Sequence, residues 1–141
     1  SGALRALTAP GLAAIIVTPS NPWLSIAPIL SIRDIKTTIS ARPAPVIAVS
    51  PIVNGAAIKG PTAKLMRELG LEPSVVSIAV HYCDILDGLV IDIQDRAQQD
   101  AIEAMGIRVS ITNTVMQNRA DKAALAQHVL DFSAQLRVEQ P

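Results

Sequence analysis

The chain has 141 residues, which corresponds to one domain or to part of a larger one, because a domain takes about 150 residues. Twelve Lys and Arg residues balance twelve Asp and Glu residues, and a net charge of zero argues against nucleic acid as a partner. Half of the residues are apolar, but the longest aliphatic run, residues 12–17, is far shorter than the roughly 18 residues that cross a membrane.

Aromatic residues and cysteine are both scarce, and each shortage narrows the possible functions. One Trp, one Tyr and one Phe leave a core of small and branched aliphatic side chains, as expected of a sheet buried on both faces. So few rings also exclude a platform on which bases stack. The single cysteine, Cys83, can form neither an internal disulfide nor a zinc finger, which fits a reducing compartment. We expect a cytoplasmic protein that binds no membrane.

Two strands and two loops are predicted in the first half of the chain. Short apolar runs predict buried strands over residues 12–17 and 45–49. A polar turn stiffened by three prolines, residues 18–28, follows the first strand. A loop over residues 50–62 follows the second strand and leads into a helix that ends near Gly70, a residue suited to a left-handed cap.

The second half of the chain repeats this alternation. Residues 74–84 are ambiguous between strand and helix, and we expect a helix because Glu72, Pro73 and Ser74 resemble a helix start. Strands are predicted over residues 89–93 and 107–111, and each is followed by a helical pattern. In the last helix the apolar residues recur at steps of four, three and four: Leu125, Val129, Phe132 and Leu136.

This order of elements determines the fold class. Strand then helix, four times over with short connections, predicts parallel strands joined by right-handed crossovers. We therefore expect an α/β protein with a Rossmann-like three-layer fold and a mostly parallel sheet of four strands. No repeat, low-complexity tract or charge block marks a boundary, so residues 1–141 are expected to form a single α/β unit.

Two loops are the candidate site, because open parallel sheets bind ligands outside the carboxyl ends of their strands. The first loop carries Ser20, Asn21 and Ser25, whose side chains can aim hydrogen bonds. The second carries the positive charge of Lys59 and runs into a helix start that favours an anion. Because Pro61 has no N–H, the donors there are the backbone groups of three residues and one hydroxyl: Gly60, Thr62, Ala63 and the Thr62 side chain.

Simpler explanations compete with this one. Pro and Gly are common at helix starts for backbone reasons alone. Gly55 and Gly60 bracket four residues as in a nucleotide P-loop, but Pro61 stands where that motif needs lysine. No G-x-G-x-x-G pattern follows a strand, so nothing supports NAD or FAD. Lys64 is a second choice after Lys59 for holding an anion.

The other polar candidates are weaker. Four consecutive residues could each bind a metal or take part in catalysis, but on a helix they point in different directions: His81, Tyr82, Cys83 and Asp84. His128 lies beside the apolar stripe of the last helix, and we expect it on the helix surface. Asp92 and Asp95 follow a strand, where Asp95 either caps a helix or faces a ligand.

Several segments, taken in order along nearly the whole chain, resemble one known family. They are PSNPWLSIAPIL at residues 19–30, VSPIVNGAAIKGPTAK at 49–64, HY at 81–82, LDGLVID at 86–92 and TNTVM at 112–116. The chain resembles the 2-phospho-L-lactate transferase family of coenzyme F420 biosynthesis. Ala27 and Asn54 depart from the family pattern, which has glycine at both positions. The family also has an amino-terminal half with a nucleotide loop, so we expect this chain to be the carboxy-terminal half.

The resemblance implies a reaction and a set of binding residues. A 2-phospholactyl or phosphoenolpyruvyl group would pass from a guanosine diphosphate-type donor to the deazaflavin Fo, with release of GMP. Mg²⁺ would be held by the amino-terminal half, and the enzyme would be a homodimer. The residues expected to bind substrate or phosphate are Ser20, Asn21, Pro22, Ser25, Ser50, Lys59, Gly60 and Thr62.

Two rival hypotheses concern the chain by itself. It could be a non-catalytic Rossmann-like module that binds a phosphate or nucleotide. It could also have a structural role in which an apolar surface drives association. In either case we expect the chain alone to be inactive as a transferase.

Overall fold

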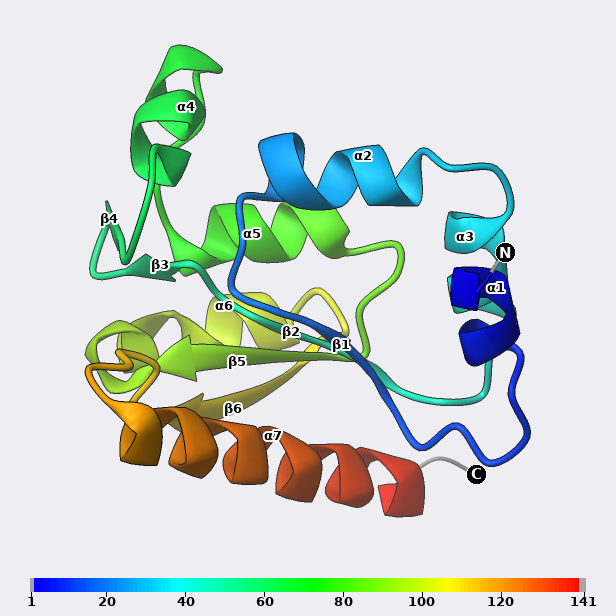
Figure 1. Cartoon of the computed structure of the whole chain (residues 1–141). Helices are drawn as coiled ribbons and strands as arrows, with labels where there is room; N and C mark the ends of the chain where they lie inside the picture. The colour runs from blue at the N-terminus through cyan, green and yellow to red at the C-terminus, as the bar shows by residue number, and fades with distance from the viewer. Residues whose placement is uncertain (1, 140–141) are drawn as a thin grey trace.

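A four-stranded parallel sheet lies at the centre of the computed structural model, which describes residues 2–139 (Figure 1). Its strands lie side by side in chain order: β1 (Ile15–Val17), β2 (Val46–Val49), β5 (Gly88–Asp92) and β6 (Arg108–Thr112). In the register, Ala48 of β2 pairs with Leu89 of β5. The predicted α/β class and parallel sheet are confirmed.

Helices cover both faces of the sheet and complete three layers (Figure 1). Successive side chains of β2 point to opposite faces. Val46 and Ala48 therefore lie in the larger core, together with residues of α3 (Ile35–Ala41), α5 (Val75–Tyr82) and α6 (Gln99–Glu103). Ile47 and Val49 lie in a smaller core covered by α7 (Arg119–Glu139) through the predicted stripe: Leu125, Val129, Phe132 and Leu136.

The first strand is shorter and less buried than predicted. It begins at Ile15 rather than at residue 12, and Ile16 is 38% exposed. The reason is its place in the sheet, because β1 pairs with β2 on one side only.

The proline-rich segment after β1 is helical, where a turn was predicted. A π-helical segment η1 (Pro22–Ile26) continues into α2 (Ala27–Leu30). Asn21 caps it, since its side-chain oxygen accepts the backbone N–H groups of Trp23 and Leu24 at 2.9 and 3.0 Å. Ala27 has a right-handed helical φ of −56°, so the backbone there does not require glycine.

A β-hairpin that the sequence analysis did not predict follows β2. Strands β3 (Ile52–Val53) and β4 (Ala56–Ala57) pair antiparallel around Asn54 and Gly55, whose φ angles are 49° and 77°. Asn-Gly is the pair that two-residue hairpin turns favour, because both positions need positive φ. Asn54 thus occupies a backbone conformation that suits glycine, and asparagine tolerates it.

The remaining helices follow the predicted plan with shifted ends. The helix α4 (Thr62–Glu68) begins after Pro61, and the ambiguous segment is the helix α5, capped by Ser74. The helix expected after β5 starts as a 3-10 segment η2 (Ile93–Gln98) before α6. One short helix, α1 (Gly2–Leu7), was not predicted, whereas α3 stands where a helix was expected between the first two strands. Within the described residues, none of the helices combines the length and apolar character that a membrane crossing needs.

Candidate functional site

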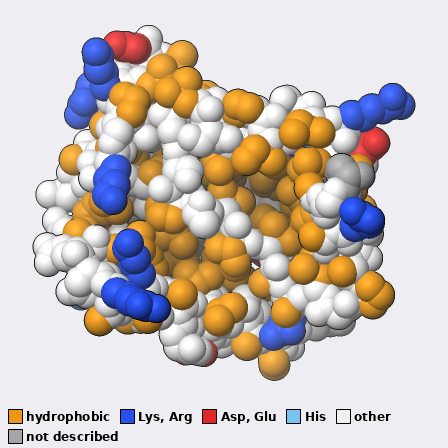
Figure 2. Space-filling view, viewed as in Figure 1, with side chains coloured by type: hydrophobic (Ala, Val, Ile, Leu, Met, Phe, Trp, Pro, Cys, Tyr) orange, Lys and Arg blue, Asp and Glu red, His pale blue; other side chains and the backbone are white. Residues whose placement is uncertain are grey.

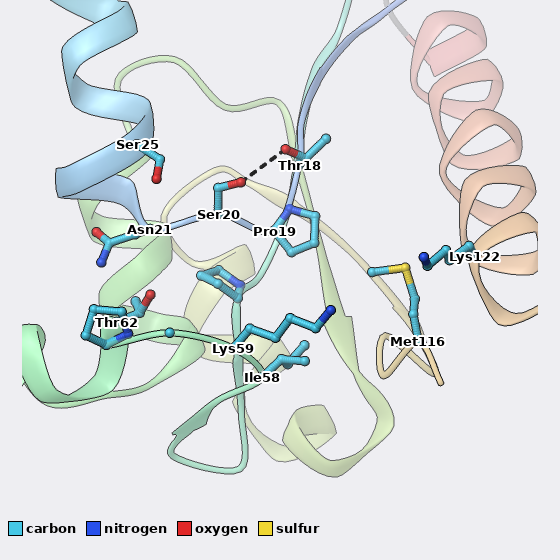
Figure 3. A pocket seen from close by; sticks show the side chains of 13 residues that line it. Thr18, Pro19, Ser20, Asn21, Ser25, Ile58, Lys59, Thr62, Met116 and Lys122 are labelled. Carbon is cyan, nitrogen blue, oxygen red and sulfur yellow. Dashed lines mark hydrogen bonds between the residues drawn. The ribbon is translucent and has the colours of Figure 1, made fainter. Parts of the chain in front are cut away.

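A cavity of about 510 Å³ opens where β1, β2 and β6 end (Figure 3). Its walls come from three segments that are far apart in sequence: residues 18–25, 51–62 and 116–122. The volume lies in the range of about 300–1,000 Å³ that is typical of small-molecule sites. The structure therefore brings the two predicted loops together at the carboxyl edge of the sheet.

Six of the predicted binding residues line this cavity, and two do not. The six are Ser20, Asn21, Ser25, Lys59, Gly60 and Thr62. Pro22 is buried as the first residue of η1. Ser50 is fully buried, and its hydroxyl donates to the carbonyl of Ile52 and accepts the N–H of Ile52, both at 3.1 Å. Pro22 and Ser50 therefore shape the two loops without lining the cavity.

The first wall presents hydroxyl and amide groups. The hydroxyls of Thr18 and Ser20 are hydrogen-bonded at 3.3 Å. The side-chain oxygen of Asn21 is engaged in capping η1, which fixes the orientation of its amide. The amide nitrogen of Asn21 is buried and has no hydrogen-bond partner among the described residues. Because this nitrogen is buried, the groups that this wall presents to a ligand are the hydroxyls of Thr18, Ser20 and Ser25.

The second wall carries the charge of Lys59. This exposed residue lies between the hairpin and α4, next to Gly60, whose φ of 71° suits glycine. Lys59 forms no ion pair with a described residue, whereas Lys64 pairs with Glu68 at 3.9 Å and does not line the cavity. The helix α4 has only seven residues, and a helix start carries only a partial positive charge. The full charge of Lys59 is therefore the stronger attraction for an anion at this wall.

The third wall was missed by the sequence analysis. It consists of Met116, in the loop after β6, and Lys122, in the first turn of α7. In Figure 3 the side chain of Lys59 extends toward these two residues. The rule that ligands lie after strand ends applies to this loop as well, but its sequence offers no charged residue to draw attention.

The cavity is positively charged although the chain is neutral. Among the described residues, two lysines line it and no Asp or Glu does. On the face shown in Figure 2, Lys and Arg side chains gather along the side where α4 and the start of α7 lie. Such a surface attracts anions.

Asp92 caps η2. The sequence analysis offered a helix-capping role for Asp95 instead. The side chain of Asp92 accepts the N–H of Gln94 at 3.0 Å and that of Thr114 at 2.8 Å. Burial raises the pKa of Asp92, but these hydrogen bonds outweigh burial and hold the pKa below its ordinary value.

Asp95 neither caps a helix nor lines the cavity. It is 3% exposed, and both carboxylate oxygens accept the N–H of Asn54 at 3.1 Å. Burial raises the pKa of Asp95, the bond from Asn54 opposes this, and the nearby charge of Asp92 adds to the rise. Asp95 thus anchors the hairpin.

The four consecutive polar residues at the end of α5 and just after it, His81 to Asp84, have separate environments. The ring of His81 lies 4.8 Å from the rings of Trp23 and Tyr82, and burial lowers the pKa of His81. Asp84 pairs with Lys36 at 2.6 Å, and Cys83 is exposed.

His128 differs from its predicted position on the free surface of the last helix. It is half-buried, and its Nε2 atom lies 2.6 Å from the hydroxyl of Ser110 on β6. The contact arises because α7 packs against the sheet.

The side chains of this chain do not fit a magnesium site. Within residues 2–139, no three His, Cys, Asp or Glu side chains come close enough to hold one ion. The two buried carboxylates, Asp92 and Asp95, already accept backbone N–H groups. Magnesium prefers carboxylates that leave room for several waters.

Comparison with known proteins reveals one matching family. The family described as 2-phospho-L-lactate transferase CofD matches residues 1–133. The chain is 41% identical over 122 residues to a 2-phospho-L-lactate transferase of Methanocaldococcus jannaschii, covering 86% of this chain and 38% of that protein. It is 34% identical over 124 residues to a phosphoenolpyruvate transferase of Kitasatospora aureofaciens, covering 87% of this chain and 39% of that protein. The chain thus spans less than half the length of these relatives.

Proposed function

The chain belongs to the 2-phospho-L-lactate transferase CofD family, and we propose on this basis that it is part of a transferase of coenzyme F420 biosynthesis. The group transferred is 2-phospholactyl or phosphoenolpyruvyl, the donor is of the guanosine diphosphate type, and the acceptor is the deazaflavin Fo. A ribityl hydroxyl of Fo attacks the phosphorus that carries the organic acid, the bond from this phosphorus to the nucleotide oxygen breaks, and GMP leaves.

The observation that carries the proposal is the charge of the cavity. Lys59 and Lys122 line it, and among the described residues no carboxylate does so and none forms an ion pair with Lys59. Phosphoryl transfer depends mainly on positioning the reactants and on neutralising charge that spreads over phosphate oxygens. A cavity with this lining suits the donor phosphates.

We assign Lys59 to a donor phosphate, with the backbone N–H of Gly60 and the hydroxyl of Thr62 as further donors. The side chains of Ser20, Asn21 and Ser25, on the opposite wall, orient donor or acceptor (Figure 3). The apolar part of the lining contacts the carbon skeleton of the ligand: Pro51, Ile58 and Met116.

Other parts of the reaction require residues outside this chain. Magnesium, which the family resemblance implies, would be held by such residues. A homodimer and a location in the cytoplasm remain predictions. Because the chain spans under two fifths of the transferase from Methanocaldococcus jannaschii, we expect no turnover from the chain alone.

One observation favours the rival hypothesis of a non-catalytic binding module. No His, Asp or Glu of residues 2–139 lines the cavity, so none of the described lining side chains is a ready general base. A binding module and a part of a transferase both bind the donor, but only the second contributes to turnover.

Assay of the complete reading frame that encodes this sequence tests the proposal. With a guanylyl phospholactate donor and Fo, K59A should lower kcat/KM by roughly tenfold or more, because it removes a charge-assisted contact worth about 1.5–3 kcal/mol. R67A, on an exposed face of α4, is the matched control and should leave kcat/KM unchanged. Equal kinetics of K59A and the wild type would remove Lys59 from the site, and absence of GMP release from the wild type would contradict the transferase.

A further inference from the structure

The packing and capping of α7 hold the backbone of Lys122 in a fixed place beside the cavity. Leu125, one turn later, is buried in the core against the sheet. Before it, Asn118 caps the helix: its side chain accepts the N–H of Asp121 at 2.8 Å, and its carbonyl accepts the N–H of Lys122 at 3.2 Å. The carboxylate of Asp121 in turn accepts the N–H of Gln117 at 2.9 Å. The backbone of Lys122 is therefore fixed before any ligand binds.

Lys122 and Lys59 reach the same cavity from different layers of the fold. Lys59 comes from the loop after the hairpin, whereas Lys122 comes from the helix on the other face of the sheet. Figure 3 shows the side chain of Lys59 pointing toward the wall formed by Met116 and Lys122. A ligand in the cavity would thus meet a cation on each side.

Neither of these two lysines is neutralised within the described residues. Lys36 and Lys64 each pair with a carboxylate, but no ion pair involves Lys59 or Lys122. Even Asp121, next to Lys122 in sequence, uses its carboxylate on a backbone N–H instead. Two like charges at one cavity repel each other, and an anion placed between them removes that repulsion.

We propose that Lys122 is a second anion-positioning residue for the diphosphate-type donor, holding one phosphate while Lys59 holds the other. This inference rests on the proposed function, because it assumes that the cavity binds the phosphate-bearing substrate. It adds Lys122 to the residues that the proposed function assigns to the phosphates. A ligand with a single phosphate would use only one of the two lysines, whereas a diphosphate would use both.

Titration of the chain with inorganic pyrophosphate and with inorganic phosphate tests this inference. Binding is followed by calorimetry and by the amide shifts of residues 18–25, 58–62 and 116–122. We expect K122A to weaken pyrophosphate binding by roughly tenfold and phosphate binding by only about twofold. The variant K122R, which keeps the charge, should bind pyrophosphate within about threefold of the wild type.

The matched control is R119A, which removes a charge from the same helix turn at an exposed residue outside the cavity lining. It measures the general effect of charge near the cavity. If K59A weakens pyrophosphate binding while K122A behaves like R119A, the inference about Lys122 is wrong and the proposed function stands. If the wild type binds neither anion, both the inference and the proposed phosphate site are contradicted.

Discussion

Asp95 binds Asn54 across 41 residues of sequence, with both carboxylate oxygens accepting one backbone N–H at 3.1 Å. Asn54 is the first residue of the left-handed turn between β3 and β4, and Lys59 follows β4 by two residues. A buried carboxylate in η2 thus anchors the hairpin that leads to the cavity lysine.

Removal of this anchor should loosen the hairpin. We expect D95A to lower the free energy of unfolding by about 1–3 kcal/mol, because it leaves the Asn54 N–H without its partner. Urea denaturation measures the loss, and hydrogen exchange should show faster exchange of the Asn54 amide. D100A, at an exposed residue of α6, is the control and should change neither quantity appreciably. Unaltered exchange at Asn54 in D95A would show that the carboxylate does not hold the turn.

Two substitutions of Asn21 separate its structural role from its role at the cavity. N21D keeps the oxygen that caps η1, so stability should be retained, but it replaces the free amide nitrogen and brings a negative charge to the cavity. N21A removes the cap and should cost about 1 kcal/mol. We expect pyrophosphate binding, measured by calorimetry, to fall more in N21D than in N21A. The reverse order would place the amide of Asn21 outside the anion site.

Gly88 at the start of β5 is required by the close approach of α7. A Cβ atom at this position would lie 2.7 Å from the ring of Phe132 and 3.0 Å from Leu136. G88A should therefore destabilise the fold by about 1–3 kcal/mol. The double variant G88A/F132L should recover part of this loss, because a smaller side chain makes room. G2A, where an added Cβ meets nothing within 4 Å, is the control. Equal stability of G88A and the wild type in thermal unfolding would contradict this packing.

His81 should make stability depend on pH. Burial holds the pKa of His81 below its ordinary value of 6.5; the charge of Asp84 opposes this shift, and that of Lys36 supports it. The unfolded chain then takes up a proton below about pH 6.5 that folded His81 does not, so stability present above this pH is lost as the pH falls. H81F should show a smaller loss of unfolding free energy between about pH 7.5 and pH 5.5 than the wild type. His128 is common to both proteins, so an equal loss in both would contradict the assignment to His81.

Local patterns were sufficient to predict the strands of the sheet interior. The continuous apolar runs at 45–49 and 89–93 match β2 and β5 to within one residue, because both faces of those strands are buried. The run at 12–17 predicted too long a strand, since only residues 15–17 pair with a neighbouring strand. The hairpin at Asn54 and Gly55 was missed although its turn signal is local and strong.

The site was predicted in part because strand ends lie on one edge of a parallel sheet. This rule is sufficient to bring Ser20 and Lys59 together without knowledge of any side-chain contact. It could not indicate Lys122, whose place at the cavity depends on how α7 packs beneath the sheet. The short helix α1 was missed for a related reason, because a helix of six residues is stabilised by tertiary packing rather than by its own sequence.

The central claim is that the cavity at the carboxyl edge binds an anion through Lys59, and an amide-resolved titration of the chain with inorganic pyrophosphate tests it most directly. We expect saturable shifts at Ser20, Asn21, Gly60 and Thr62, with an affinity that falls roughly tenfold in K59A. The same affinity in K59A, or shifts confined to the hollow beside Gly106 and Arg108 at the far end of β6, would contradict it.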